Sequence, residues 1–169
     1  AILRQKKIKH LPILNDNRQL SGLHVLEGFN PEGMVENPLI IMAGGKGTRM
    51  MPLTRDLPKP MLEIGGKPIM QHIIEKGRDC GFYQFYLTVN YRRDRIEQYF
   101  GDGGGLGVSI EYVYENKPLG TAGSLSLISD KITLPCVVTN GDVFSNINFR
   151  DIVEFHETHK ADATMATRP

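Results

Sequence analysis

The chain has 169 residues, of which 40% are hydrophobic and 23% charged, and its formal net charge is +1 at pH 7. This length fits one compact domain with a small appendage, and so small a charge argues against nucleic-acid binding by electrostatics alone. We find no apolar run of about 18 residues that could cross a bilayer and no signal-peptide pattern. Cys80 and Cys136 lack CxxC spacing, which indicates neither a zinc site nor a disulfide framework. We therefore expect a cytoplasmic protein that binds neither nucleic acid nor membrane.

The first part of the chain predicts a hairpin, with strands at residues 9–14 and 19–26 joined by turn formers. Two strands cannot bury both of their faces, so this segment needs a partner. Residues 1–29 resemble part of a CBS repeat, a module that pairs to bind adenosyl ligands. The resemblance implies a partial CBS-like segment, with an adenine nucleotide bound at a complete CBS pair. Residues 30–37, which include Asn-Pro-Glu-Gly, predict a linker.

From residue 38 onward, predicted strands alternate with predicted helices. Apolar or alternating runs indicate strands at residues 38–43, 85–89, 108–114 and 136–139, with a further strand starting at 163–166. Apolar residues at helical spacing indicate a helix at residues 67–80, and we also predict helices at 92–100, 120–128 and 152–159. This alternation predicts an α/β sandwich with a mostly parallel sheet over residues 38–169.

A glycine-rich string follows the first of these strands, reading MAGGKGTRMMPLT at residues 42–54 and PKPM at 58–61. Its glycines allow backbone N–H groups to approach phosphate oxygens, while Arg49 offers a planar cationic fork and Lys59 a point charge. The string is not a Walker A motif. It is not GxGxxG either, because Met50 takes the final glycine position, and this disfavours a dinucleotide-dependent oxidoreductase. A plain glycine-rich turn is the alternative.

Two carboxylates stand out further along the chain. Glu115 precedes the string NKPLGTAG, and a carboxylate accepts hydrogen bonds only, so it suits the N1–H and 2-amino donors of guanine. The alternative is a solvated glutamate at a strand end. Asp142 follows a predicted buried strand, which places it at the carboxyl edge of the sheet, where α/β proteins bind ligands. A turn-forming Gly-Asp pair is the alternative there.

These strings together resemble the signature AGGxGTR…PLTxxxPKPM of the nucleotide-sugar pyrophosphorylases, the sugar-1-phosphate nucleotidylyltransferases. A glutamate before PLGTAG is similar to the guanylyltransferases of this family. The resemblance implies a Rossmann-like three-layer sandwich of the nucleotide-diphospho-sugar transferase type. It also implies that residues 38–169 are the nucleotide-binding part, truncated at the C-terminus, with the sugar-binding half beyond residue 169.

The family's roles map onto individual residues of this chain. The resemblance assigns nucleotide binding to Ala43, Gly44, Gly45, Gly47, Thr48, Glu115, Gly120 and Thr121. It assigns catalysis to Arg49, Lys59 and Asp142, and Mg²⁺ binding to Asp142. The implied reaction joins a nucleoside triphosphate, with GTP favoured, to a sugar-1-phosphate and releases pyrophosphate. A non-catalytic regulatory or scaffolding relative is the alternative function, and the sequence leaves both the sugar and a homo-oligomer open.

Overall fold

The computed structural model describes residues 8, 10–25, 33–45, 47, 50–117, 119–120 and 122–167. The chain divides into two compact units, residues 1–34 and 35–169. In the first unit, β1 (His10–Leu14) and β2 (Leu20–Val25) pair antiparallel, so the predicted hairpin is confirmed. Asn15 shapes its turn, because the side-chain oxygen accepts from the backbone N–H groups of Asn17 and Gln19 at 3.1 and 2.9 Å. The CBS-like character of this segment stays a prediction.

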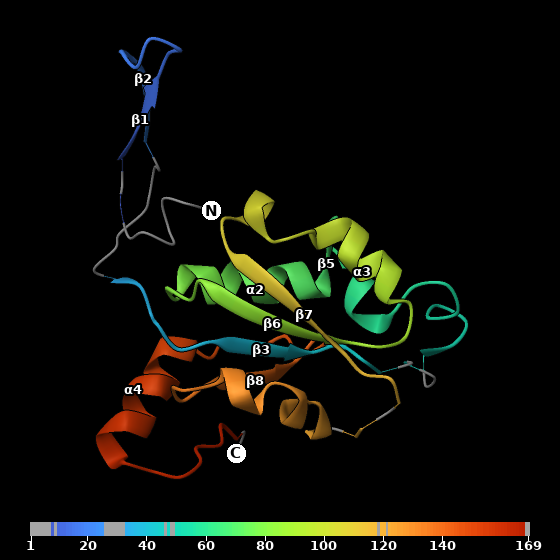
Figure 1. Cartoon of the computed structure of the whole chain (residues 1–169). Helices are drawn as coiled ribbons and strands as arrows, with labels where there is room; N and C mark the ends of the chain where they lie inside the picture. Colours follow the sequence, from blue (N-terminus) through green and yellow to red (C-terminus); the bar gives the residue numbers. More distant parts are fainter. Residues whose placement is uncertain are drawn as a thin grey trace. The chain divides into compact units, whose positions relative to one another are not determined.

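The second unit is built on a four-stranded parallel sheet with the order β7-β6-β3-β8. Its strands are β3 (Leu39–Met42), β6 (Gln84–Val89), β7 (Ser109–Tyr114) and β8 (Val137–Asn140). From β3 the chain first adds β6 and β7 on one side and then returns to add β8 on the other (Figure 1). The strand order therefore reverses between β3 and β8, and α/β sheets bind ligands at the carboxyl ends of strands flanking such a reversal.

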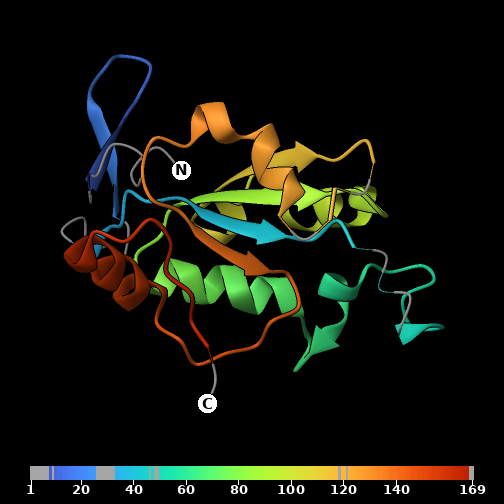
Figure 2. The same cartoon turned by 90° about the horizontal axis from the view of Figure 1, so that it is seen from below.

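Helices and turns cover the two faces of this sheet. One face buries Leu39 and Ile41 of β3 with apolar residues of α2 (Ile69–Asp79), α3 (Arg93–Phe100) and α4 (Phe149–His159). The other face buries Ile40 beside Ile128, which lies between the 3-10 turns η5 (Gly123–Leu127) and η6 (Ser129–Lys131). Figure 2 shows these turns on the opposite side of the sheet from α2. The predicted three-layer α/β sandwich is thus confirmed.

Three predicted elements differ from the structure. The helix predicted at 67–80 begins at Ile69, because β5 (Lys67–Pro68) pairs with β4 (Glu63–Ile64) in a short hairpin. The helix predicted at 120–128 is the 3-10 turn η5, in which glycine and serine are weak helix formers. The strand predicted at 163–166 is irregular, and it pairs with no strand in the part of the chain that the structure describes.

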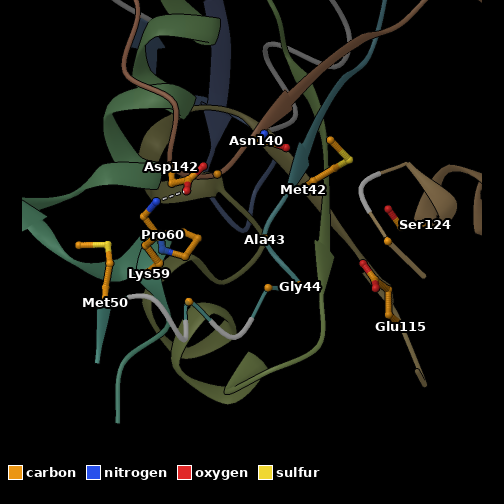
Figure 3. A pocket seen from close by; sticks show the side chains of 14 residues that line it. Met42, Ala43, Gly44, Met50, Lys59, Pro60, Glu115, Ser124, Asn140 and Asp142 are labelled. Carbon is orange, nitrogen blue, oxygen red and sulfur yellow. Dashed lines mark hydrogen bonds and ion pairs between the residues drawn. The ribbon is translucent and has the colours of Figure 1, made fainter. Parts of the chain in front are cut away.

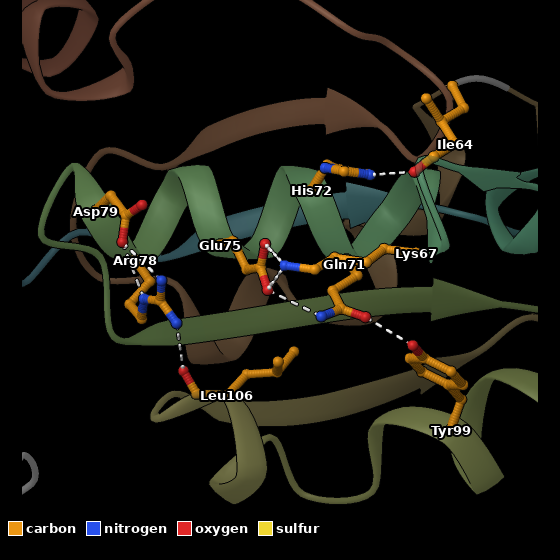
Figure 4. Close-up of polar contacts among 9 residues, drawn as sticks. All are labelled: Ile64, Lys67, Gln71, His72, Glu75, Arg78, Asp79, Tyr99 and Leu106. Atoms are coloured by element: carbon orange, nitrogen blue, oxygen red, sulfur yellow. Dashed lines mark hydrogen bonds and ion pairs between the residues drawn. The ribbon is translucent and has the colours of Figure 1, made fainter.

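Polar contacts fix α2 against its neighbours (Figure 4). Glu75 accepts from Lys67 Nζ of β5 at 3.0 Å and from Gln71 Nε2 at 2.8 Å, and Gln71 Oε1 accepts from the Tyr99 hydroxyl of α3 at 2.7 Å. Burial acts to raise the pKa of Glu75, but the hydrogen bonds from Gln71 and Lys67 outweigh it and hold this pKa below its usual value. Among the described helices, none has the length and apolar character needed to span a membrane.

Candidate nucleotide-binding site

A cavity of about 410 Å³ opens at the carboxyl ends of β3 and β8, where the strand order reverses. Its described walls come from the glycine-rich string, the segment after β7 and the segment after β8 (Figure 3). The lining residues are Met42, Ala43, Gly44, Gly45, Gly47, Met50, Lys59, Pro60, Glu115, Gly120, Ser124, Asn140, Gly141 and Asp142.

Backbone hydrogen bonds bring the three segments to the same edge of the sheet. The N–H groups of Ala43, Glu115 and Gly141 donate to the carbonyls of the neighbouring strands β6, β6 and β3 at 2.9, 3.0 and 2.8 Å. Gly44 directly follows the hydrogen-bonded Ala43, and Asp142 directly follows the hydrogen-bonded Gly141. The sheet therefore fixes the points at which the glycine-rich string and the segment containing Asp142 leave their strands.

The glycine-rich string is held by a residue that the sequence analysis did not single out. Thr54 is 1% exposed, and its hydroxyl donates to the Gly47 carbonyl at 2.8 Å. Gly47 has φ +60°, and a Cβ atom there would lie 3.0 Å from Thr54 Cγ2, so both backbone conformation and space require glycine. The Tyr91 hydroxyl donates to the Arg55 carbonyl at 2.5 Å and ties the end of the string to the segment after β6.

One side of the cavity carries an ion pair. Lys59 Nζ contacts Asp142 Oδ2, and the two side chains are 32% and 29% exposed (Figure 3). Pro60, which follows Lys59, packs closely against Gly141, which precedes Asp142. A Cβ atom on Gly141 would lie 3.0 Å from Pro60 Cγ. We call Lys59, Pro60, Gly141 and Asp142 the ion-pair side.

Glu115 and Ser124 lie on the opposite side of the cavity, which we call the Glu115 side (Figure 3). The Glu115 carboxylate packs against Gly44, where a Cβ atom would lie 2.8 Å from Oε1, and Oε2 accepts from the Leu119 N–H at 3.5 Å. Ser124 is 1% exposed, and its hydroxyl has no hydrogen-bond partner among the described residues. This side therefore carries acceptor and hydroxyl groups that have few hydrogen-bond partners among the residues that the structure describes.

Most residues of the predicted site lie around this one cavity. Those that line it are Ala43, Gly44, Gly45, Gly47, Lys59, Glu115, Gly120 and Asp142. Thr48, Arg49 and Thr121 lie outside the described residues. Sequence reasoning missed Met42, Met50, Pro60, Ser124, Asn140 and Gly141 as lining residues. Five of these six lie within two residues of a predicted site residue, which was the signal available, whereas Ser124 is three residues from Thr121.

The donor set at this cavity bears on the expected metal. No group of three or more His, Cys, Asp or Glu side chains that could hold a metal ion occurs among the described residues. Asp142 presents a single carboxylate at the cavity wall, already beside the cationic ammonium of Lys59. One carboxylate fits Mg²⁺ bound together with substrate phosphates and water, which is how this ion is commonly held, and does not form a complete protein cage.

Comparison with known proteins decides the family. The family model for nucleotidyl transferases matches residues 39–169, which is most of the chain. The chain belongs to the nucleotidyl transferase family. The predicted resemblance to sugar-1-phosphate nucleotidylyltransferases is thereby confirmed.

Relatives and solved structures refine this assignment. The chain is 39% identical over 127 residues to mannose-1-phosphate guanylyltransferase of Mycobacterium tuberculosis, covering 75% of this chain and 35% of that protein. It is 41% identical over 133 residues to mannose-1-phosphate guanyltransferase of Pichia angusta, covering 75% and 36%. The chain therefore spans about a third of the length of these relatives.

Among solved structures, a putative glucose-1-phosphate thymidylyltransferase from Bacillus anthracis matches with a TM-score of 0.67 and 30% identity, covering 73% of this chain and 51% of that one. HddC from Yersinia pseudotuberculosis, solved with GMP-PN, matches with a TM-score of 0.64 and 30% identity, covering 71% and 54%. Both neighbours share the fold of this chain; one is named as a thymidylyltransferase, and the other was solved with a guanine nucleotide.

Proposed function

We propose that this chain is the nucleotide-binding part of an enzyme that transfers a guanylyl group from GTP to a sugar-1-phosphate, giving a GDP-sugar and pyrophosphate. The observation that carries this proposal is the cavity at the strand reversal, with the Lys59–Asp142 pair on one side and Glu115 on the other. A triphosphate needs cations at one end, and guanine needs an acceptor at the other. The lining of the cavity includes one group of each kind, Lys59 and Glu115.

In the proposed reaction, a phosphate oxygen of the sugar-1-phosphate attacks the α-phosphorus of GTP in line. A new O–P bond forms as the bond between the α-phosphorus and the bridging oxygen to the β-phosphorus breaks, and that electron pair leaves with pyrophosphate. No general base is required, because the attacking phosphate is already ionised. Positioning and electrostatic stabilisation then supply most of the acceleration.

The residues of the chain take distinct roles in this proposal. Lys59, together with Arg49 on the evidence of the motif alone, binds the phosphates and stabilises the charge of the leaving pyrophosphate. Asp142 is the residue that would hold Mg²⁺, which when bound neutralises charge on the α-phosphate. The glycines Gly44, Gly45 and Gly47 allow backbone N–H groups to approach the phosphates. Thr48, Gly120 and Thr121 complete the proposed nucleotide contacts.

Guanine is favoured by the chemistry of Glu115. Its carboxylate lies at the cavity wall against Gly44 and can accept from the N1–H and 2-amino groups of guanine. The relatives named as guanylyltransferases and the neighbour solved with GMP-PN support the same base. We place the reaction in the cytoplasm, where nucleoside triphosphates and reduced thiols coexist, in keeping with the free Cys80 and Cys136.

A pyrophosphate-release assay on the full-length protein tests this function. GTP, UTP, CTP and dTTP are each paired with a panel of sugar-1-phosphates in the presence of Mg²⁺. We expect release with at least one sugar-1-phosphate and a preference for GTP. Absence of release with every pair would overturn the enzymatic function and leave a regulatory relative. Preference for another base would overturn GTP as the substrate and the role of Glu115, while nucleotidyl transfer would stand.

A further inference from the structure

The ion-pair side joins residues that are far apart in the sequence but closely fixed in space. Lys59 and Asp142 are separated by 83 positions, and the contact between their neighbours Pro60 and Gly141 holds the two backbones together. Pro60 is buried within the 3-10 turn Lys59–Met61, and the Gly141 N–H donates a hydrogen bond to the Met42 carbonyl at 2.8 Å. Because this packing leaves the two backbones little room to shift, we expect the pair to open by movement of the side chains, and lysine has a flexible four-carbon stem for this.

The ammonium of Lys59 and a divalent cation require the same place. Both are attracted to the Asp142 carboxylate, and Lys59 already contacts Oδ2. Of the lining residues that the structure describes, Lys59 is the one with a positive charge. A cation that binds Asp142 in the absence of nucleotide must therefore displace the Lys59 ammonium. Among the described lining residues, the one other anionic group is Glu115, which lies on the opposite side of the cavity.

A polyphosphate changes this balance. Its oxygens offer the Lys59 ammonium an alternative set of acceptors, and they also supply ligands for a divalent cation. Nucleotide binding would thus remove the competitor from Asp142 and complete the oxygen shell of the metal in the same event. Linkage makes this coupling reciprocal, so the metal would tighten nucleotide binding by the same factor.

We propose that Lys59 acts as an internal counter-ion that blocks Asp142 to divalent cations until a nucleoside triphosphate binds and takes over the ammonium. The identity of the triggering ligand rests on the function proposed above. The competition between Lys59 and a cation for the carboxylate rests on the ion pair itself. Metal binding at this site then follows nucleotide binding. In the empty cavity, the Lys59 ammonium keeps Mg²⁺ from binding Asp142.

Titration of the nucleotide-free, full-length protein with Mn²⁺, followed by the EPR signal of the free ion, tests this competition directly. Mn²⁺ prefers the same oxygen ligands as Mg²⁺. We expect Lys59→Met to bind Mn²⁺ at least about fivefold more tightly than the unaltered protein, the lower end of typical coupling between sites. The gain should disappear in the double variant Lys59→Met/Asp142→Asn.

A matched control separates direct competition from the general loss of one positive charge. Lys76 bonds the carbonyl of Ser145, three residues beyond Asp142, without contacting the carboxylate. Lys76→Met should leave Mn²⁺ affinity within about twofold of the unaltered protein, in line with screened electrostatics between separated charges. Lys59→Gln serves as a second variant if Lys59→Met fails to fold, as judged by circular dichroism.

Three results would overturn the proposal: no gain in Mn²⁺ affinity without Lys59, a gain that persists after Asp142→Asn, or an equal gain in Lys76→Met. The titration contains neither nucleotide nor sugar, so its outcome is independent of the pyrophosphate-release assay. A protein that releases pyrophosphate but shows no gain lacks the counter-ion block alone. A protein that shows the gain but releases no pyrophosphate lacks the proposed reaction alone.

Discussion

On the ion-pair side of the cavity, Lys59 and Asp142 contact each other before any ligand arrives, whereas the polar groups on the Glu115 side have few hydrogen bonds to the described residues. Ser124 has a buried hydroxyl without a partner among the described residues, and Glu115 receives one long bond of 3.5 Å from the Leu119 N–H. A ligand must therefore break an existing contact on the first side, while it can add missing ones on the second.

The two sides also differ in stiffness. Gly141 is enclosed by the Pro60 ring and the Met42 carbonyl, at 3.0 and 3.2 Å from the position of an added Cβ atom, and neither can move without the backbone. Gly44 faces the end of the Glu115 side chain, which can rotate away. In the function proposed above, we therefore expect the ion-pair side to hold a fixed geometry, as group transfer requires, and the Glu115 side to adapt to the base.

The largest effect is expected from Asp142→Asn. We predict that kcat/KM for pyrophosphate release falls by about 100-fold or more, the size of effect seen when one electrostatic contact to a transition state is removed. Because this change also frees the Lys59 ammonium for phosphate, affinity for GTP in the presence of EDTA should be kept or increased. Calorimetry with GTP measures this second quantity. A weaker metal-free affinity would contradict the view that Asp142 restrains Lys59.

Gly141→Ala tests the stiffness of the ion-pair side. An added methyl group there meets a proline ring and a backbone carbonyl, so we predict a loss of about 1–3 kcal/mol in the free energy of unfolding. Urea titration measures it, with Gly44→Ala as the matched control on the other side. That control should cost less than about 0.5 kcal/mol, because Glu115 can rotate away. Equal costs for the two alanines would remove the distinction between a stiff and an adaptable side.

Much of this arrangement could be predicted from the sequence, because each strand of the sheet is recognisable from its own short run of residues. Buried parallel strands appear as short apolar runs such as residues 38–43, and the residues that follow them lie at one edge of the sheet. The position of Asp142 follows from that rule, whereas Gly44 and Glu115 were assigned to the nucleotide site by the family resemblance, and all three line the cavity.

Other features have no local signature. The Lys59–Asp142 contact spans 83 positions, and a serine is mostly exposed in proteins, so nothing in the sequence indicates that Ser124 is buried. The helix predicted at 120–128 was wrong because 3-10 turns can bury Leu125 and Ile128 without a regular α-helix. The hairpin at β4 and β5 was hidden because Pro68 also suits a first helical turn.

Glu115→Gln tests base recognition on the Glu115 side. Glutamine replaces one acceptor oxygen by a donating amide, so it can no longer accept from two guanine donors at once. We predict a fall of about tenfold in the ratio of kcat/KM for GTP to that for dTTP, equivalent to about 1.4 kcal/mol. Glu111→Gln is the matched control, since Glu111 lies on β7, the strand that Glu115 follows, and its side chain pairs with Lys131. An unchanged ratio in Glu115→Gln would assign base selection to other residues.

The smallest effect concerns Ser124. A buried hydroxyl without a partner costs free energy, so Ser124→Ala should raise the free energy of unfolding of the ligand-free protein by about 1 kcal/mol. Ser126→Ala is the control, because the exposed Ser126 hydroxyl donates to the Gly123 carbonyl at 2.7 Å and its removal should bring no gain. Thermal unfolding with and without GTP extends the test. If the nucleotide supplies a partner for the Ser124 hydroxyl, the gain in stability of Ser124→Ala shrinks on adding GTP. If Ser124→Ala is destabilised without GTP, the hydroxyl already has a partner and the contrast between the two sides of the cavity fails.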